Sequence, residues 1–110
     1  MKNGYGKYKK TSIESASKEK ILLLLYEGAI RFIKQAKEAD DNKQIAQRGE
    51  CIGRAYDIVM ELASSLDFKI GGSMAENLEQ LYIYTMEELT RANITGQQKH
   101  LDNALKILSI

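Results

Sequence analysis

Apolar residues repeat along most of the chain at the three- and four-residue spacing of helices. The richest stretch, residues 21–33, carries more apolar side chains than one buried helix face requires. Proline is absent from the 110 residues, and strand-type alternation is hard to find. The pattern predicts long helices. The surplus of apolar side chains predicts that the first helix packs against several other helices of the fold or binds a partner outside the chain.

Polar and glycine-containing breaks divide this pattern into four helices, expected at about residues 17–39, 43–66, 73–92 and 97–110. Ser17 is the expected N-cap of the first helix, and Gly96 the expected C-cap of the third. The paired glycines 71–72 permit left-handed backbone angles between the second and third helices. Short connections make consecutive helices antiparallel. The fold class is therefore all-α, a single domain over residues 1–110: an antiparallel up-and-down four-helix bundle with a flexible N-terminal arm over residues 1–16.

Helical spacing places the apolar surplus of the first helix on two faces. The stripe expected to build the core consists of Ile21, Leu25, Gly28, Phe32, Ala36 and Ala39. Leu23 and Ile30 lie nearly opposite that stripe, and Ile83 projects from the far side of the third helix. Two explanations stay open. Neighbouring helices of the bundle fill these second faces, or an amphipathic helix of another protein docks there.

Charge and cysteine content limit the classes of partner. Sixteen basic and fifteen acidic residues leave a formal charge of +1, so no global field attracts nucleic acid or an anionic membrane. Lysines and tyrosines alternate in residues 5–10, which leaves an RNA-binding tail as an alternative. The run 21–26 is too short to span a membrane, and the single Cys51 suits a reducing compartment. The expected location is the cytoplasm, without membrane insertion.

Candidate chemistry is sparse. His100 is the only histidine, so a helical di-metal site built from two Glu-x-x-His pairs is excluded. One cysteine with one histidine also falls short of the three or four ligands that zinc needs. His100 is expected to be solvent-exposed, and the adjacent Glu87 and Glu88 are expected to be ordinary surface charges. The sequence predicts no catalytic residue, no metal and no cofactor.

Residues 25–33, Leu-Tyr-Glu-Gly-Ala-Ile-Arg-Phe-Ile, resemble the first-helix signature of the flagellin-specific export chaperones, the FliS family. Residues 77–93 resemble the third helix of that family, and Tyr8 sits where the family carries a tyrosine in its N-terminal arm. Lys18 replaces a frequent proline, and the fourth helix ends without the usual terminal tryptophan. The resemblance spans nearly the whole chain.

The resemblance implies a chaperone that works without ATP. It would bind the C-terminal segment of newly made flagellin, prevent premature polymerisation and keep flagellin competent for flagellar type III secretion. Export-gate components are a further candidate partner, and Tyr8 would plug the binding surface until the client arrives. The rival hypotheses are a self-associating bundle, dimeric without client, and a nucleic-acid-binding module. The residues expected to contact flagellin are Tyr8, Leu23, Ile30, Ile52, Tyr56, Val59, Leu78, Leu81, Tyr82, Ile83 and Tyr84.

Overall fold

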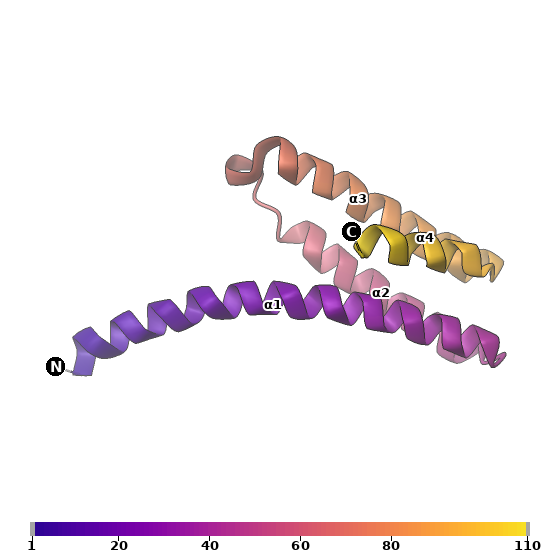
Figure 1. Ribbon diagram of the computed structural model, residues 1–110, viewed down its shortest axis with the longest axis horizontal. Helices are drawn as coiled ribbons and strands as arrows, with labels where there is room; N and C mark the ends of the chain where they lie inside the picture. Colours follow the sequence, from indigo (N-terminus) through magenta and orange to yellow (C-terminus); the bar gives the residue numbers. More distant parts are fainter. Residues whose placement is uncertain (1, 110) are drawn as a thin grey trace.

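The structure is a computed structural model that describes the backbone of residues 2–109 and the side chains of residues 17–109. The described chain forms four helices: α1 Lys2–Asp41, α2 Ile45–Ser64, α3 Phe68–Thr95 and α4 Gln98–Leu108. They run alternately in opposite directions (Figure 1). The predicted all-α, up-and-down four-helix bundle is confirmed.

Local sequence explains where α3 begins, bends and ends. The side chain of Asp67 caps its start by accepting hydrogen bonds from the backbone amides of Lys69 and Ile70. Gly72 then adopts a positive φ of 51°, which bends the helix after its first turn. Gly96, with a φ of 71°, ends the helix in the left-handed region, so the predicted C-cap is confirmed.

The predicted start of the first helix at Ser17 is wrong, because α1 is continuous from Lys2 to Asp41. No proline interrupts this stretch, so helical hydrogen bonding continues through Ser17. The side chains of residues 1–16 lie outside the described part of the chain.

Helix α4 packs against both α3 and α1, while α2 packs against α1 and α3 from the other side. The core contains fully buried side chains from all four helices, among them Ile33, Val59, Leu89 and Leu101. Ile21 was predicted to be a core residue, but 55% of its surface is exposed. It lies where α1 passes only the end of α2, in a shallow hollow with Glu61 and Ser64.

One end of the bundle, which we call the closed end, contains the α1–α2 and α3–α4 turns (Figure 1). Polar side chains connect these two turns through hydrogen bonds and an ion pair. Arg48 Nη1 lies 2.6 Å from Asp40 Oδ1, and Gln98 Nε2 donates to Asp40 Oδ2 at 2.9 Å and to Asp41 Oδ1 at 2.6 Å. The other end, which we call the open end, contains the α2–α3 connection. Helix α4 stops before reaching it.

Candidate functional site

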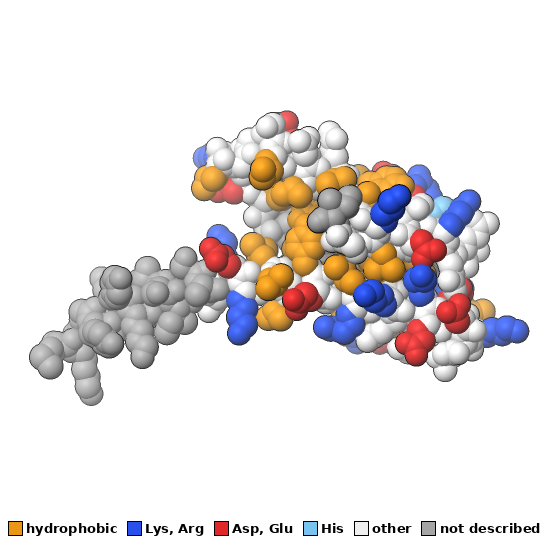
Figure 2. All heavy atoms as spheres, viewed as in Figure 1, with side chains coloured by type: hydrophobic (Ala, Val, Ile, Leu, Met, Phe, Trp, Pro, Cys, Tyr) orange, Lys and Arg blue, Asp and Glu red, His pale blue; other side chains and the backbone are white. Residues whose placement is uncertain are grey.

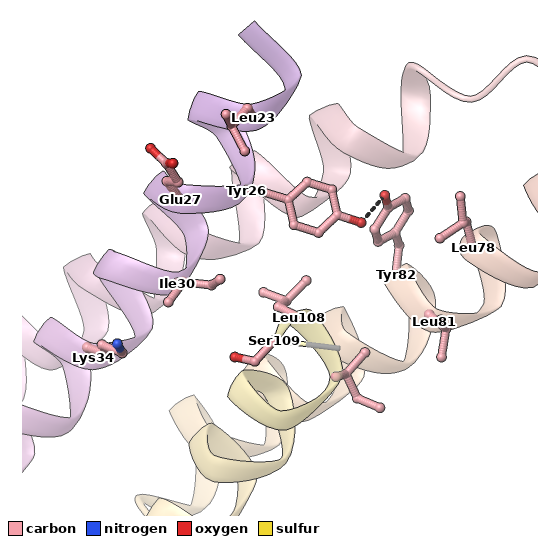
Figure 3. Close-up of a pocket in the computed structure, with 11 residues that line it drawn as sticks. Leu23, Tyr26, Glu27, Ile30, Lys34, Leu78, Leu81, Tyr82, Leu108 and Ser109 are labelled. Atoms are coloured by element: carbon pink, nitrogen blue, oxygen red, sulfur yellow. Dashed lines mark hydrogen bonds between the residues drawn. The ribbon is translucent and has the colours of Figure 1, made fainter. Parts of the chain in front are cut away.

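An apolar groove begins where α4 ends. Its walls are Leu23 and Ile30 of α1 and Leu78 and Leu81 of α3, and Leu108 closes it on the α4 side (Figure 3). We call this space, of about 680 Å³, the main groove. In the surface view, hydrophobic side chains gather between α1 and α3, whereas charged side chains predominate over the closed end (Figure 2). The main groove is thus an apolar surface that the described helices leave open.

Two tyrosines form the floor of the main groove. Tyr26 of α1 and Tyr82 of α3 point toward each other, and their hydroxyl oxygens lie 2.5 Å apart in a hydrogen bond (Figure 3). Burial is the main cause that raises the pKa of Tyr82, and the hydrogen bond with Tyr26 raises it further. The Tyr82 hydroxyl therefore stays neutral near pH 7. The pair braces α1 against α3 at the place where α4 no longer separates them.

The main groove continues toward the open end into a second hollow of about 390 Å³, which we call the open-end pocket. The two spaces share Tyr26, Leu78 and Tyr82. Leu62 and Leu66 of α2 add to the lining, and the bend at Gly72 places Ile70 and Met74 along its rim. Ile70 and Met74 are 87% and 70% exposed, which is unusual for large apolar side chains. The apolar surface therefore extends from Leu108 to the start of α3.

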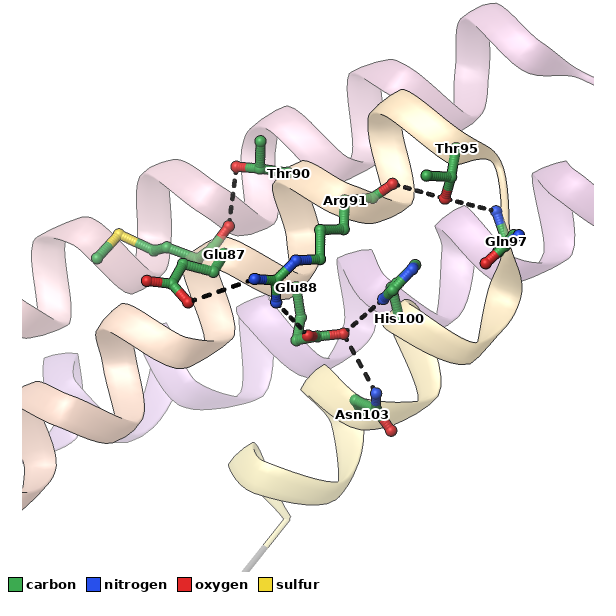
Figure 4. Close-up of polar contacts among 9 residues, drawn as sticks. Glu87, Glu88, Thr90, Arg91, Thr95, Gln97, His100 and Asn103 are labelled. Carbon is green, nitrogen blue, oxygen red and sulfur yellow. Dashed lines mark hydrogen bonds and ion pairs between the residues drawn. The ribbon is translucent and has the colours of Figure 1, made fainter.

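A buried carboxylate fixes α4 against α3. Glu88 of α3 is 4% exposed and accepts hydrogen bonds from Arg91 Nη1 at 2.7 Å and Asn103 Nδ2 at 3.2 Å. His100 Nδ1 lies 2.7 Å from Glu88 Oε2, the same carboxylate oxygen that accepts from Asn103 (Figure 4). Burial alone would raise the pKa of Glu88, but the bonds from His100, Asn103 and Arg91 outweigh it and hold the pKa below its ordinary value. The position of α4, and so the end wall of the main groove, depends on this cluster.

This cluster corrects two predictions. His100 was expected to be solvent-exposed, yet only 13% of its side chain is. Glu88 was expected to be a surface charge like Glu87, but it points into the α3–α4 interface. Adjacent residues on a helix point about 100° apart, so one can be buried while the other is exposed. The pairing of Glu88 with His100 crosses the α3–α4 turn, and helical spacing within either helix does not reveal it.

The structure brings five of the predicted flagellin-contacting residues together in the main groove. They are Leu23, Ile30, Leu78, Leu81 and Tyr82.

The other predicted residues lie elsewhere. Ile52 and Val59 are buried in the core, because their face of α2 packs inside the bundle. Tyr56 and Ile83 line a separate shallow hollow between α2 and α3. Tyr84 is 39% exposed and lines neither hollow, and the Tyr8 side chain lies outside the described residues.

Sequence reasoning missed several parts of this surface. Tyr26 was not among the residues expected to contact flagellin, but its hydroxyl reaches across to Tyr82 in the floor of the main groove. Ile107 and Leu108 also line the main groove, and neither was among the residues expected to contact flagellin. A signal was available for them, since a fourth helix much shorter than the third must leave part of its neighbours uncovered. The contribution of Ile70 and Met74 depends on the bend at Gly72, which the spacing of apolar residues does not show.

Apolar side chains make up most of the lining of the main groove and of the open-end pocket. Within residues 17–109, no three His, Cys, Asp or Glu residues lie close enough to hold a metal ion. None of the helices traced over residues 2–109 combines the length and hydrophobicity needed to cross a bilayer. An elongated apolar groove on a rigid helical frame is suited to an apolar polypeptide segment. Fold and groove together define a helical-bundle protein that binds other polypeptides.

Comparison with known proteins identifies the family. Residues 1–110 match the family described as "Flagellar protein FliS". The chain is 37% identical to the flagellar secretion chaperone FliS of Vibrio cholerae serotype O1, over 98% of this chain and 82% of that protein. It is 33% identical to the flagellar secretion chaperone FliSB of Pseudomonas aeruginosa, over 92% of this chain and 83% of the relative. The chain belongs to the FliS family.

Proposed function

We propose that the chain is a flagellar export chaperone that binds the C-terminal segment of flagellin in the cytoplasm. Binding would keep that segment from polymerising and hold flagellin competent for flagellar type III secretion. The observation that carries this proposal is the continuous apolar surface from Leu108 to Ile70, which the described helices leave uncovered. Two relatives at 37% and 33% identity are named flagellar secretion chaperones, which agrees with the proposal.

The groove suits a client that is disordered before it binds. Such a segment loses conformational entropy when it becomes ordered, so it needs an extended apolar surface rather than a compact pocket. The main groove and the open-end pocket form one surface of this kind, braced from below by Tyr26 and Tyr82. The proposed chaperone activity requires only that the client binds, and it includes no covalent step.

The direct test is titration of the chain with a flagellin C-terminal peptide, followed by calorimetry and by size-exclusion chromatography with light scattering. We expect a soluble one-to-one complex. Leu81→Asp, which places a charge in the groove wall, should abolish most of the heat while the melting temperature stays close to that of the wild type. Gln80→Asp, at the adjacent exposed position outside the groove, is the matched control. Wild-type protein that releases no binding heat would refute the proposal.

The same preparation separates the rival hypotheses. A dimer that persists on dilution and does not dissociate with the peptide would indicate a self-associating bundle. RNA binding with a steep salt dependence would indicate a nucleic-acid module. The role of Tyr8 as a plug remains a prediction. Deleting residues 1–10 should speed peptide association if the plug exists, and unchanged kinetics would exclude it.

A further inference from the structure

The floor of the main groove contains two tyrosine hydroxyl groups that share one hydrogen bond. Each hydroxyl can donate one hydrogen atom and can accept others through its lone pairs. In the bond between Tyr26 and Tyr82, one hydroxyl donates and the other accepts, so the accepting hydroxyl keeps a hydrogen atom of its own. Within residues 17–109, neither hydroxyl makes a second hydrogen bond. The pair therefore retains one donor that the described part of the chain does not satisfy.

Burial indicates which of the two hydroxyls keeps this hydrogen atom. Tyr82 is 5% exposed, whereas Tyr26 is only partly buried. A donor without an acceptor costs more free energy where water is excluded, so we expect the Tyr82 hydroxyl to donate and the Tyr26 hydroxyl to accept. The pKa of Tyr82 agrees with this direction, because burial raises it and the bond with Tyr26 raises it further, as a bond donated by the neutral hydroxyl does. The unsatisfied donor is then the hydroxyl of Tyr26.

The walls around Tyr26 cannot accept this hydrogen atom. Leu78 and Leu81 of α3 and Ile30 of α1 are hydrocarbon side chains. The carboxylate of Glu27, the next residue on α1, points away from the two tyrosines (Figure 3). Solvent water accepts such a hydrogen atom while the groove is open. A bound segment that excludes water leaves the donor unpaired unless the segment itself supplies an acceptor.

We infer that Tyr26 determines specificity in the main groove by donating a hydrogen bond to a neutral carbonyl oxygen of the bound client segment. This inference rests on the proposed function, because it places the flagellin C-terminal segment in the groove. It adds a polar requirement to an otherwise apolar site: a segment that presents only hydrocarbon to Tyr26 binds more weakly than one that presents an oxygen. A neutral oxygen suits this place better than a carboxylate, because an ionised group loses its hydration there.

Tyr26→Phe and Tyr82→Phe form a matched pair for the test. Both substitutions remove the same hydrogen bond between α1 and α3, so a role in bracing alone predicts equal effects on client binding. Tyr26→Phe also removes the donor that serves the client, whereas Tyr82→Phe leaves the Tyr26 hydroxyl in place. Calorimetry measures the affinity of each variant for the flagellin C-terminal segment. Thermal unfolding checks that both variants are folded at the temperature of the titration.

We expect Tyr26→Phe to weaken binding by about fivefold, as the loss of one hydrogen bond implies, and Tyr82→Phe to stay within about twofold of the wild type. Equal weakening by the two variants would reduce the pair to a brace and overturn the inference. Wild-type affinity in Tyr26→Phe would overturn it as well, while leaving flagellin binding intact. Wild-type protein that binds no flagellin segment refutes the proposed function itself.

A second measurement distinguishes the two sources of a neutral carbonyl oxygen, the side chain of Asn or Gln and the client backbone. Each Asn and Gln of the client segment is replaced by Ala and titrated against the wild type and Tyr26→Phe. A side-chain acceptor gives one client position whose effect disappears in the Tyr26→Phe background. A backbone acceptor gives this coupling instead with amide-to-ester replacements, which weaken one carbonyl at a time. Absence of coupling in both series would overturn the inference.

Discussion

The two ends of this bundle differ in which side chains they expose. At the closed end four helices are present, and Asp40, Arg48 and Gln98 form hydrogen bonds across the turns. Helix α4 ends before the open end, where large apolar residues such as Ile70 and Met74 are exposed. Within the described residues, polar side chains link the turns at one end, and large apolar side chains are exposed at the other.

The difference shows how a small domain can stay folded while exposing an apolar surface. Exposed apolar area contributes no burial energy, so stability must come from elsewhere in the molecule. The closed half supplies it through fully buried Ile33 and Leu101 and through the Glu88 cluster that fixes α4. If this division holds, substitutions in the closed half should change stability, and substitutions in the groove should change client affinity.

The largest effect is expected from Ile33, which is fully buried between helices. Ile33→Ala should lower the free energy of unfolding by about 2 to 5 kcal/mol, and Ile33→Val by about 0.5 to 1.5, because of lost burial and the cavity left behind. Leu23→Ala, at a 59% exposed groove position, should stay within about 0.5 kcal/mol of the wild type. Urea denaturation measures all three. Equal losses for Ile33→Ala and Leu23→Ala would abolish the distinction between core and groove.

Glu88 is expected to have the next largest effect. Glu88→Ala leaves the donors of Arg91, His100 and Asn103 without their acceptor and should cost about 1 to 3 kcal/mol. Hydrogen exchange should accelerate most in α4, the helix that the cluster anchors. Glu87→Ala is the matched control, because Glu87 is the adjacent carboxylate with 55% of its side chain exposed. A comparable loss in Glu87→Ala would show that Glu88 does not hold α4.

Acid should weaken the closed end through the same carboxylate. The pKa of Glu88 is lower in the folded protein than its ordinary value of 4.5, so its stabilisation is fully present above that value. It should be lost as the pH falls through the folded pKa. Hydrogen bonds from Gln98 and Arg48 also lower the pKa of Asp40 below 3.8, which adds a second loss in the same direction.

The measurement is urea unfolding of the wild type and Glu88→Gln across a pH series from neutral to strongly acidic. The stability advantage of the wild type should be constant near neutrality and shrink below about pH 4.5, as linkage requires. An advantage that does not change with pH would mean that the charge of Glu88 contributes nothing.

The contrast between the two ends also explains what sequence reasoning could predict. Helical periodicity and the breaks between the predicted helices were enough to predict the bundle, because those signals are local. The third helix was expected to start at residue 73, but α3 starts at Phe68 and contains the bend at Gly72. Periodicity likewise placed Leu23 and Ile30 opposite the expected core stripe of the first helix, and both line the main groove. The burial of Ile52 and Val59, by contrast, depends on how α2 is rotated against its neighbours. The Glu88–His100 and Tyr26–Tyr82 contacts join separate helices, so spacing within one helix cannot predict them.

The floor of the groove provides a smaller test at the boundary between the two halves. Tyr26→Phe and Tyr82→Phe each remove the same hydroxyl–hydroxyl bond and should each cost about 0.5 to 1.5 kcal/mol. The double variant should cost less than the sum, because the second substitution removes a bond already lost. A double-mutant cycle by thermal unfolding measures this coupling. Strict additivity would mean that the two hydroxyls act independently and do not brace α1 against α3.

The smallest effect should come from Tyr84, an exposed residue of α3 that lies outside the main groove. Tyr84→Ala should change client affinity less than about threefold, or about 0.6 kcal/mol, because neutral contacts surround the few residues that dominate an interface. Leu81→Ala, three residues earlier and in the groove wall, should weaken binding by more than about fivefold, or about 1 kcal/mol. Both positions are about equally exposed, so burial alone does not separate them. Calorimetry with the flagellin peptide ranks the two variants. A larger loss from Tyr84→Ala would move the client from the α1–α3 groove to another face of α3.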